Sequence, residues 1–319
     1  MLYTYSATNQ RYQIGKQMGV KAQRWIVMSD LDGSLLDHHT YAYDAALPAL
    51  SALKDAQIPL VLNTSKTRSE CQNLAKQLGL LAPIVVENGG GISLPTRPAS
   101  GDPYGHAADV EFPEDLFIRL GVSRESIHRV LDEIATCRSL RYRSFAQMSL
   151  DELRDRTGLD EASAINAQLR QVSEPLLWED SAEALAWFTK RLQRKGLTLT
   201  QGGRFHTVSG KHDKGGALHW VRSFFHTLWH MPVHILALGD GPNDLSMLEA
   251  ADQAICVRSP VHPPLEGPQG VYPATHLEGP SGWNESLLNF LNEIKTDTSL
   301  VGLTGDETNY LLEDLRMTV

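Results

Sequence analysis

Residues 26–37 read IVMSDLDGSLLD, an apolar run that ends in two carboxylates, Asp30 and Asp32, with Gly33 directly after them. Continuous apolarity, in place of alternation, is typical of a strand that is buried on both faces of a parallel sheet. Like charges at the end of such a strand are costly unless a cation or a substrate engages them. This stretch therefore predicts a buried strand with functional groups at its carboxyl end.

Similar apolar runs recur along the chain, at residues 58–64, 83–87, 233–240 and 254–258. Helical patterns lie between them, at residues 44–56, 67–79, 214–229 and 243–251. Strands that alternate with helices predict an α/β fold with a doubly wound parallel sheet.

The alternation breaks where a Pro-, Gly- and Ser-rich segment, SLPTRPASGDPYG, begins. We predict a core domain from residues 24–92 and 205–295, and an inserted second domain from residues 93–204. The basic residues 1–23 and the acidic residues 296–319 are predicted to be terminal extensions.

The composition limits the classes of function. The chain has 319 residues, 42% of them hydrophobic and 21% charged, which is ordinary for a globular protein. A net charge of −9 argues against binding to nucleic acid, but not against a small anionic substrate. Three widely spaced cysteines, no signal-peptide pattern and no membrane-spanning run predict a cytoplasmic protein without a membrane partner. The oligomeric state is not predicted.

Polar residues follow several of the predicted strands, and ligands of open α/β sheets bind beyond the carboxyl ends of the strands. Besides Asp30 and Asp32, these residues are Thr64, Glu87, Asn88, Asp240, Asn243 and Asp244. Clustered carboxylates need a cation, and hard oxygen ligands favour Mg²⁺. Taken alone, DLDGS and GDGPND also fit turns followed by capped helices. Their joint placement at strand ends favours a site.

Two further residues suit a phosphate ligand. Thr64 offers a hydroxyl donor, although it also fits the N-cap of a helix. Lys214 lies in the first turn of a predicted helix, where it opposes the helix dipole. A solvated surface lysine is the alternative for Lys214.

In this order, DLDGSLLD, Thr64, Lys214 and GDGPND resemble the four motifs of the haloacid dehalogenase superfamily. The resemblance implies a magnesium phosphohydrolase with an inserted α+β cap domain of type C2B. Asp30 is then the nucleophile that forms an aspartyl-phosphate, and Asp32 the general acid and base. Mg²⁺ is held by Asp30, the main-chain carbonyl of Asp32, and Asp240, with Asp244 in support. Thr64 and Lys214 hold the phosphoryl oxygens.

Over residues 25 to 293 the chain further resembles mannosyl-3-phosphoglycerate phosphatase, an enzyme that makes the compatible solute mannosylglycerate. The segments that carry this resemblance are TYAYDAALPAL, NTSKTRSE, VVENGGGI, FAQMSLDELRDRTGLDEASA, RQVSEPLLW, LTLTQGGRFHTVSGKHDKGGAL and GPSGWNESLL. It implies a small sugar-phosphate substrate. The residues expected to contact this substrate from the core motifs are Ser34, Ser65, Lys66, Asn88 and Asn243.

The cap is expected to select the substrate. Arg170 and Arg204 are candidates for a glycerate carboxylate, because a guanidinium binds planar acceptors in bidentate fashion. Glu174 is a candidate acceptor for sugar hydroxyls. The alternatives are an Arg170–Glu174 pair at helical spacing and a surface position for Arg204.

The cap also departs from the family pattern. The family usually has REFSEP, where this chain has Gln171 and Val172, and an Asp at the position of Gln147. A glucosyl-3-phosphoglycerate or another sugar phosphate therefore remains an alternative substrate. A sugar phosphomutase and a non-catalytic sugar-phosphate sensor are alternative functions.

Overall fold

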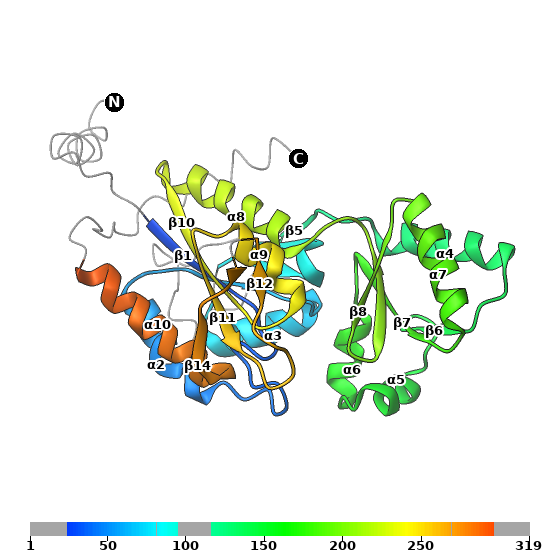
Figure 1. Ribbon diagram of the computed structural model, residues 1–319, viewed down its shortest axis with the longest axis horizontal. Coiled ribbons are helices and arrows are strands. Elements are labelled where there is room, and N and C mark those ends of the chain that lie inside the picture. The colour runs from blue at the N-terminus through cyan, green and yellow to red at the C-terminus, as the bar shows by residue number, and fades with distance from the viewer. Residues whose placement is uncertain (1–23, 81, 95–115, 269, 297–319) are drawn as a thin grey trace.

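The chain forms two units that lie side by side, each built around its own sheet (Figure 1). The computed structural model describes residues 24–80, 82–94, 116–268 and 270–296. The predicted terminal extensions, residues 1–23 and 297–319, lie outside the described residues. Among the helices of the described part, none combines the length and apolar composition that crossing a membrane requires.

The larger unit contains an eight-stranded sheet with the order β14-β11-β10-β1-β2-β3-β4-β5. Pairing is parallel from β14 through β3 and antiparallel for β4 and β5. The strands are β1 (Arg24–Ser29), β2 (Leu60–Asn63), β3 (Ile84–Val86), β4 (Gly91–Leu94), β5 (Leu116–Arg119), β10 (Val233–Gly239), β11 (Gln253–Arg258) and β14 (Ala274–Glu278). The short strands β12 (Glu266–Gly267) and β13 (Gly270–Val271) pair with each other.

Strand β1 lies at the centre of this sheet, and its side chains supply both hydrophobic cores. Val27 packs with Trp283 and Leu287 in one cluster, whereas Ile26 and Met28 belong to the cluster on the opposite face. Successive residues of a strand point to opposite faces, so a strand that is covered on both sides must be apolar throughout. The continuous apolar pattern of the sequence has this cause.

Helices cover both faces of the large sheet. The helical elements of this unit are η1 (Asp44–Ala46), α2 (Leu47–Asp55), α3 (Arg68–Leu78), η2 (Glu87–Gly89), α8 (Lys214–Trp229), η4 (Pro242–Asp244), α9 (Leu245–Ala250) and α10 (Gly279–Thr296). In α10, the buried indole of Trp283 donates from Nε1 to Ser29 Oγ at 2.9 Å. This contact attaches α10 directly to the end of β1.

The smaller unit has a four-stranded antiparallel sheet with the order β6-β7-β9-β8. Its strands are β6 (Tyr142–Ser144), β7 (Ser173–Trp178), β8 (Thr198–Gly202) and β9 (Phe205–Ser209). Its helices are α4 (Arg124–Cys137), α5 (Leu150–Thr157), α6 (Glu161–Gln168) and α7 (Ala182–Arg194). Each of these helices begins after a side chain that accepts a backbone hydrogen bond: Ser123, Ser149, Asp160 and Ser181.

The predicted fold class is confirmed: a central, mainly parallel sheet with helices on both faces carries an inserted α+β unit. The predicted boundaries at residues 93 and 204 differ from the strand pairing. Strand β5 extends the large sheet, and β9 belongs to the small one. We infer that the inserted unit spans residues 120–210, because the chain leaves the large sheet after β5 and returns to it after β9.

Candidate active site

Asp30 is the first residue after β1, and Gly33 makes the turn that follows it. The Asp30 amide donates to Leu238 O of β10 at 2.9 Å, which fixes the end of β1 against its neighbour. Gly33 has a φ of +83°, and a Cβ there would lie 2.4 Å from Asp240 Oδ2. Glycine is therefore required at this position both by the backbone conformation and by the close approach of Asp240.

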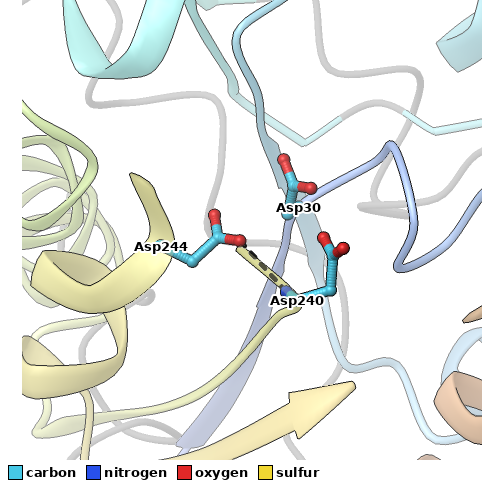
Figure 2. A group of neighbouring side chains, drawn as sticks. All are labelled: Asp30, Asp240 and Asp244. Carbon is cyan, nitrogen blue, oxygen red and sulfur yellow. Dashed lines mark hydrogen bonds between the residues drawn. The ribbon is translucent and has the colours of Figure 1, made fainter. Parts of the chain in front are cut away.

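Asp30, Asp240 and Asp244 converge from the end of β1, the end of β10 and η4, as Figure 2 shows. Each offers a carboxylate oxygen, and these oxygens lie within 4.8 Å of one another. All three residues are buried. Asp244 Oδ2 also accepts hydrogen bonds from the amides of Asp240 and Gly241, both at 3.0 Å, which fixes the turn between β10 and η4.

Lys214 begins α8 and lies fully buried among these carboxylates. Its Nζ lies 2.5 Å from Asp30 Oδ1 and 2.6 Å from Asp244 Oδ1. Burial acts to lower the pKa of Lys214, but the charges of Asp244 and Asp30 outweigh it and hold this pKa above its ordinary value. The alternative of a solvated surface lysine is wrong, because these two ion pairs explain a lysine in a first helical turn.

One ammonium does not balance the negative charge of the site. Burial raises the pKa of Asp30 well above its ordinary value, and Asp244, Asp32 and Asp240 raise it further against the opposing effect of Lys214. Burial and then Asp244 likewise raise the pKa of Asp240, although a hydrogen bond from Ser259 opposes them. Additional positive charge favours the ionised form of these carboxylates, and a divalent cation bound by oxygen ligands would supply it. The residues present therefore fit Mg²⁺.

Asp32 lies apart from the three converging carboxylates. Its Oδ1 is 2.8 Å from Lys66 Nζ, and its side chain is one-third exposed, at 33%. The Lys66 ammonium also lies over the ring of Tyr41, 4.7 Å from the centroid. The Lys66 ammonium thus holds Asp32 beside the site, and the Asp32 side chain remains partly accessible to solvent. The expected role of its main-chain carbonyl at the cation stays a prediction.

Thr64 follows β2 and is fully buried. Its Oγ1 accepts from the Lys66 amide at 3.2 Å, and its carbonyl accepts from the Asn88 amide at 2.8 Å. The alternative that Thr64 caps a helix is wrong: α3 is capped by Thr67, which forms a reciprocal capping box with Glu70. The Thr64 hydroxyl therefore stabilises the turn after β2, and its contact with a phosphate stays a prediction.

The structure also brings other predicted residues to this edge. Ser34 Oγ lies 3.5 Å from Asp240 Oδ1, and Asn243 Nδ2 donates to Asn88 Oδ1 at 3.3 Å. Ser65 connects the edge to the smaller unit, because its carbonyl accepts from Arg170 Nη1 at 3.3 Å. Of the predicted cap residues, Arg170 thus contacts the core.

Glu174 and Arg204 are placed differently from the predictions. Glu174 is fully buried in β7, where it accepts from Arg124 Nε at 2.6 Å, bonds His128 Nε2 at 2.6 Å and accepts from the Ala146 amide at 3.0 Å. Both of its oxygens are therefore engaged inside the cap, and a contact between Glu174 and a sugar stays a prediction. A helical Arg170–Glu174 pair is also wrong, because Ser173–Trp178 is a strand.

Arg204 is exposed on the turn between β8 and β9, with Nη2 3.4 Å from Thr157 O. This position agrees with the alternative of a surface residue. A contact between Arg204 and substrate stays a prediction.

Ser259 is a residue of the site that was not predicted from the sequence. It follows β11, and its Oγ donates to Asp240 Oδ2 at 2.8 Å, which fixes the orientation of that carboxylate. The rule that polar residues after parallel strands gather at one edge applies to Ser259 as well, so the signal was present in AICVRSP.

Comparison with known proteins gives the same fold. Residues 27–102 match the sequence profile of the haloacid dehalogenase-like hydrolases. Among solved structures, a Thermoplasma acidophilum protein matches with a TM-score of 0.58 at 16% identity, over 84% of this chain and 98% of that one. A phosphatase of the same superfamily from Bacteroides thetaiotaomicron matches with a TM-score of 0.56 at 17% identity, over 84% and 95%.

The sucrose-phosphatase of Synechocystis, solved with sucrose and phosphate, matches with a TM-score of 0.52 at 15% identity, over 84% of this chain and 98% of that one. The fold is thus similar to that of haloacid dehalogenase-like hydrolases, and residues 27–102 match their sequence profile. The narrower likeness to mannosyl-3-phosphoglycerate phosphatase rests on the sequence motifs alone.

Proposed function

We propose that this protein is a magnesium-dependent phosphatase that hydrolyses a phosphorylated glycosylglycerate, with mannosyl-3-phosphoglycerate as its first candidate substrate. The observation that carries the phosphatase proposal is the arrangement of Lys214 against Asp30 and Asp244, with Asp240 beside them. A nucleophilic carboxylate, a fixed cation and a set of oxygen ligands are the groups that phosphoryl transfer to an aspartate requires.

In this mechanism Asp30 attacks the phosphorus atom in line with the leaving alkoxide, and the ester P–O bond breaks as the aspartyl-phosphate forms. Lys214 and Thr64 stabilise the charge that spreads over the phosphoryl oxygens. Asp30, Asp240 and Asp244 would hold Mg²⁺, which neutralises phosphoryl charge when bound.

Asp32 would move the protons. It donates one to the leaving oxygen in the first step, and in the second it takes one from the water that attacks the aspartyl-phosphate. Its accessible carboxylate suits this exchange with substrate and water. Asp30 is regenerated when the P–O bond of the intermediate breaks and inorganic phosphate leaves.

The substrate proposal rests on the motifs shared with mannosyl-3-phosphoglycerate phosphatases and on Arg170. A phosphoglycerate ester carries a carboxylate besides its phosphate, and a guanidinium close to Ser65 is suited to such an anion. Glucosyl-3-phosphoglycerate and other sugar phosphates are the alternatives, since Gln147, Gln171 and Val172 depart from the family pattern.

Phosphate release from a panel of substrates tests this function. The panel contains mannosyl- and glucosyl-3-phosphoglycerate, sucrose phosphate, hexose phosphates and p-nitrophenyl phosphate, each with Mg²⁺ and with chelator. The expected result is Mg²⁺-dependent release, fastest from a glycosyl-phosphoglycerate. Asp30→Asn should be inactive, whereas Asp55→Asn, the same change on an exposed residue of α2, should match the wild type.

The other outcomes identify the competing functions. Isomerisation of a hexose phosphate that depends on a bisphosphate would indicate a phosphomutase. If the protein binds sugar phosphates but hydrolyses none of them, it is a sensor, and the phosphatase proposal is refuted.

A further inference from the structure

Glu87 is a buried core residue to which the proposed chemistry assigns no role. It follows β3, is 2% exposed and has a φ of +49°, a conformation that is uncommon for residues other than glycine. Its amide donates to Lys66 O at 2.9 Å, and its carbonyl lies 3.2 Å from His212 Nε2. The backbone of Glu87 is thus fixed to the loop that carries Thr64 and to the segment that leads into Lys214.

The side chain of Glu87 crosses to the smaller unit. Its Oε1 accepts from the Gln171 amide at 2.8 Å, and its Oε2 accepts from the Val172 amide at 3.1 Å and from Ser173 Oγ at 2.5 Å. Three donors therefore converge on one carboxylate. All three donors are satisfied only if both terminal atoms of the side chain accept hydrogen bonds. A glutamine cannot do this, because one of its terminal atoms is the NH₂ donor.

Ser173 continues this contact to Arg170. Arg170 Nη1 donates to Ser173 Oγ at 3.1 Å and to Ser65 O at 3.3 Å. The chain of hydrogen bonds runs from Glu87 through Ser173 to Arg170 and ends beside Thr64. A guanidinium that is held at two points has fewer accessible rotamers and is pre-organised for an anion.

We propose that Glu87 and Ser173 are positioning residues for substrate specificity: they hold Arg170 over the phosphoryl site, where it binds the anionic part of the leaving group. This inference rests on the proposed phosphatase function and deepens it. It assigns selection of the leaving group to a contact between core and cap, and not to the cap alone. Turnover of a small ester without such an anionic group depends less on this contact.

Two variants test the proposal. Glu87→Gln keeps the size of the side chain but removes an acceptor, and Ser173→Ala removes the hydroxyl that joins Glu87 to Arg170. Ser209→Ala is the matched control: Ser209 lies opposite Ser173 in the same sheet, is also buried, and bonds Thr198 Oγ1 and Gly210 O instead.

The first measurement is the ratio of kcat/KM for a glycosyl-phosphoglycerate to kcat/KM for p-nitrophenyl phosphate. We expect this ratio to fall roughly tenfold or more in Glu87→Gln, because the lost hydrogen bonds involve a charged acceptor. It should fall in the same direction but less in Ser173→Ala, mainly through KM, and stay at the wild-type value in Ser209→Ala. An unchanged ratio in both test variants would overturn the proposal.

The second measurement is hydrogen exchange at the amides of Gln171 and Val172, which requires no substrate. Exchange should be faster in Glu87→Gln than in the wild type and in Ser209→Ala, and wild-type rates there would also overturn the proposal. If the wild type hydrolyses no sugar phosphate, the proposed function fails. Faster exchange would in that case still support the contact between Glu87 and the cap.

Discussion

Replacing Lys214 with methionine tests how the site balances its charge. The change keeps the length of the side chain and removes the ammonium that lies 2.5 Å from Asp30 and 2.6 Å from Asp244, both buried. Removing one partner of a buried ion pair costs about 3–5 kcal/mol, because the remaining charge has no compensation. At about 1.5–2 °C per kcal/mol for a chain of 319 residues, the expected fall in Tm is roughly 4–10 °C.

The assay is thermal unfolding at pH 7.5 with EDTA, so that no divalent cation compensates the carboxylates. Lys211→Met is the matched control, since Lys211 is exposed and only three residues away. Adding Asp30→Asn to Lys214→Met should recover part of the lost stability, because it removes one of the unpaired carboxylates. The kcat of Lys214→Met should fall about 10²–10³-fold, as on removing a donor that stabilises transition-state charge.

A Tm within about 2 °C of the wild type would refute the reasoning, since the ion pairs would then contribute nothing measurable. An equal loss of stability in Lys211→Met would refute it as well, because the effect would not depend on burial. If the double variant is less stable than Lys214→Met alone, then the Asp30 carboxylate does not destabilise the fold when the Lys214 ammonium is absent, and the reasoning is refuted.

EDTA should abolish activity, and Mg²⁺ should raise Tm more at pH 7.5 than at pH 5. The pKa values of Asp30 and Asp240 are raised above 3.8 in the fold. Their ionisation therefore costs stability as the pH rises from 3.8 through the raised values, and a bound cation relieves this cost. Full activity in EDTA, or an equal Tm shift at both pH values, would contradict this. Asp30→Asn should end turnover and raise Tm in EDTA, measured beside Asp55→Asn; a lower Tm would contradict the assigned charge cost. Asp32→Asn should lower kcat by about 10²–10⁴-fold with the fold intact, and a near-normal kcat would exclude it as the general acid. Arg170→Ala should lower kcat/KM roughly 30-fold or more for a phosphoglycerate ester, whereas Arg204→Ala should change it by less than about threefold; the reverse order would place the anion at the β8–β9 turn.

The sequence predicted five of the six parallel strands in the described residues, and the core of the candidate site, for one physical reason. It missed the edge strand β14, whose residues are mostly exposed and form no continuous apolar run. Parallel strands that are covered on both faces are apolar throughout, and their carboxyl ends meet at one edge. Asp30, Thr64, Asp240 and Asp244 each follow such a strand closely, so local patterns were enough to place them together. Lys214 was recognised because it conflicts with the helix dipole, and its buried partners explain the conflict.

The cap was predicted less well because its polar contacts join distant segments. Glu174 meets Arg124 and His128, which are 50 and 46 residues away, and no local pattern reports these pairings. Spacing of four residues suggested a helical pair with Arg170, but SEPLLW forms a strand whose alternate side chains fill the cap core. The antiparallel strand β5 consists of exposed and half-buried residues, so no continuous apolar run marks it in the sequence.

The attachment of α10 to β1 has a consequence for synthesis of the protein. Trp283 bonds Ser29 across 254 residues, and β1 pairs with β10 beside Asp30. At about 5–20 residues per second, translation takes roughly 10–40 s to pass from Asp30 to Asp240. During that interval the apolar first strand has no partner on one side and depends on protection from aggregation. The nascent chain thus contains Asp30 early, but we expect the candidate site to assemble only after Asp240 and Trp283 have left the ribosome.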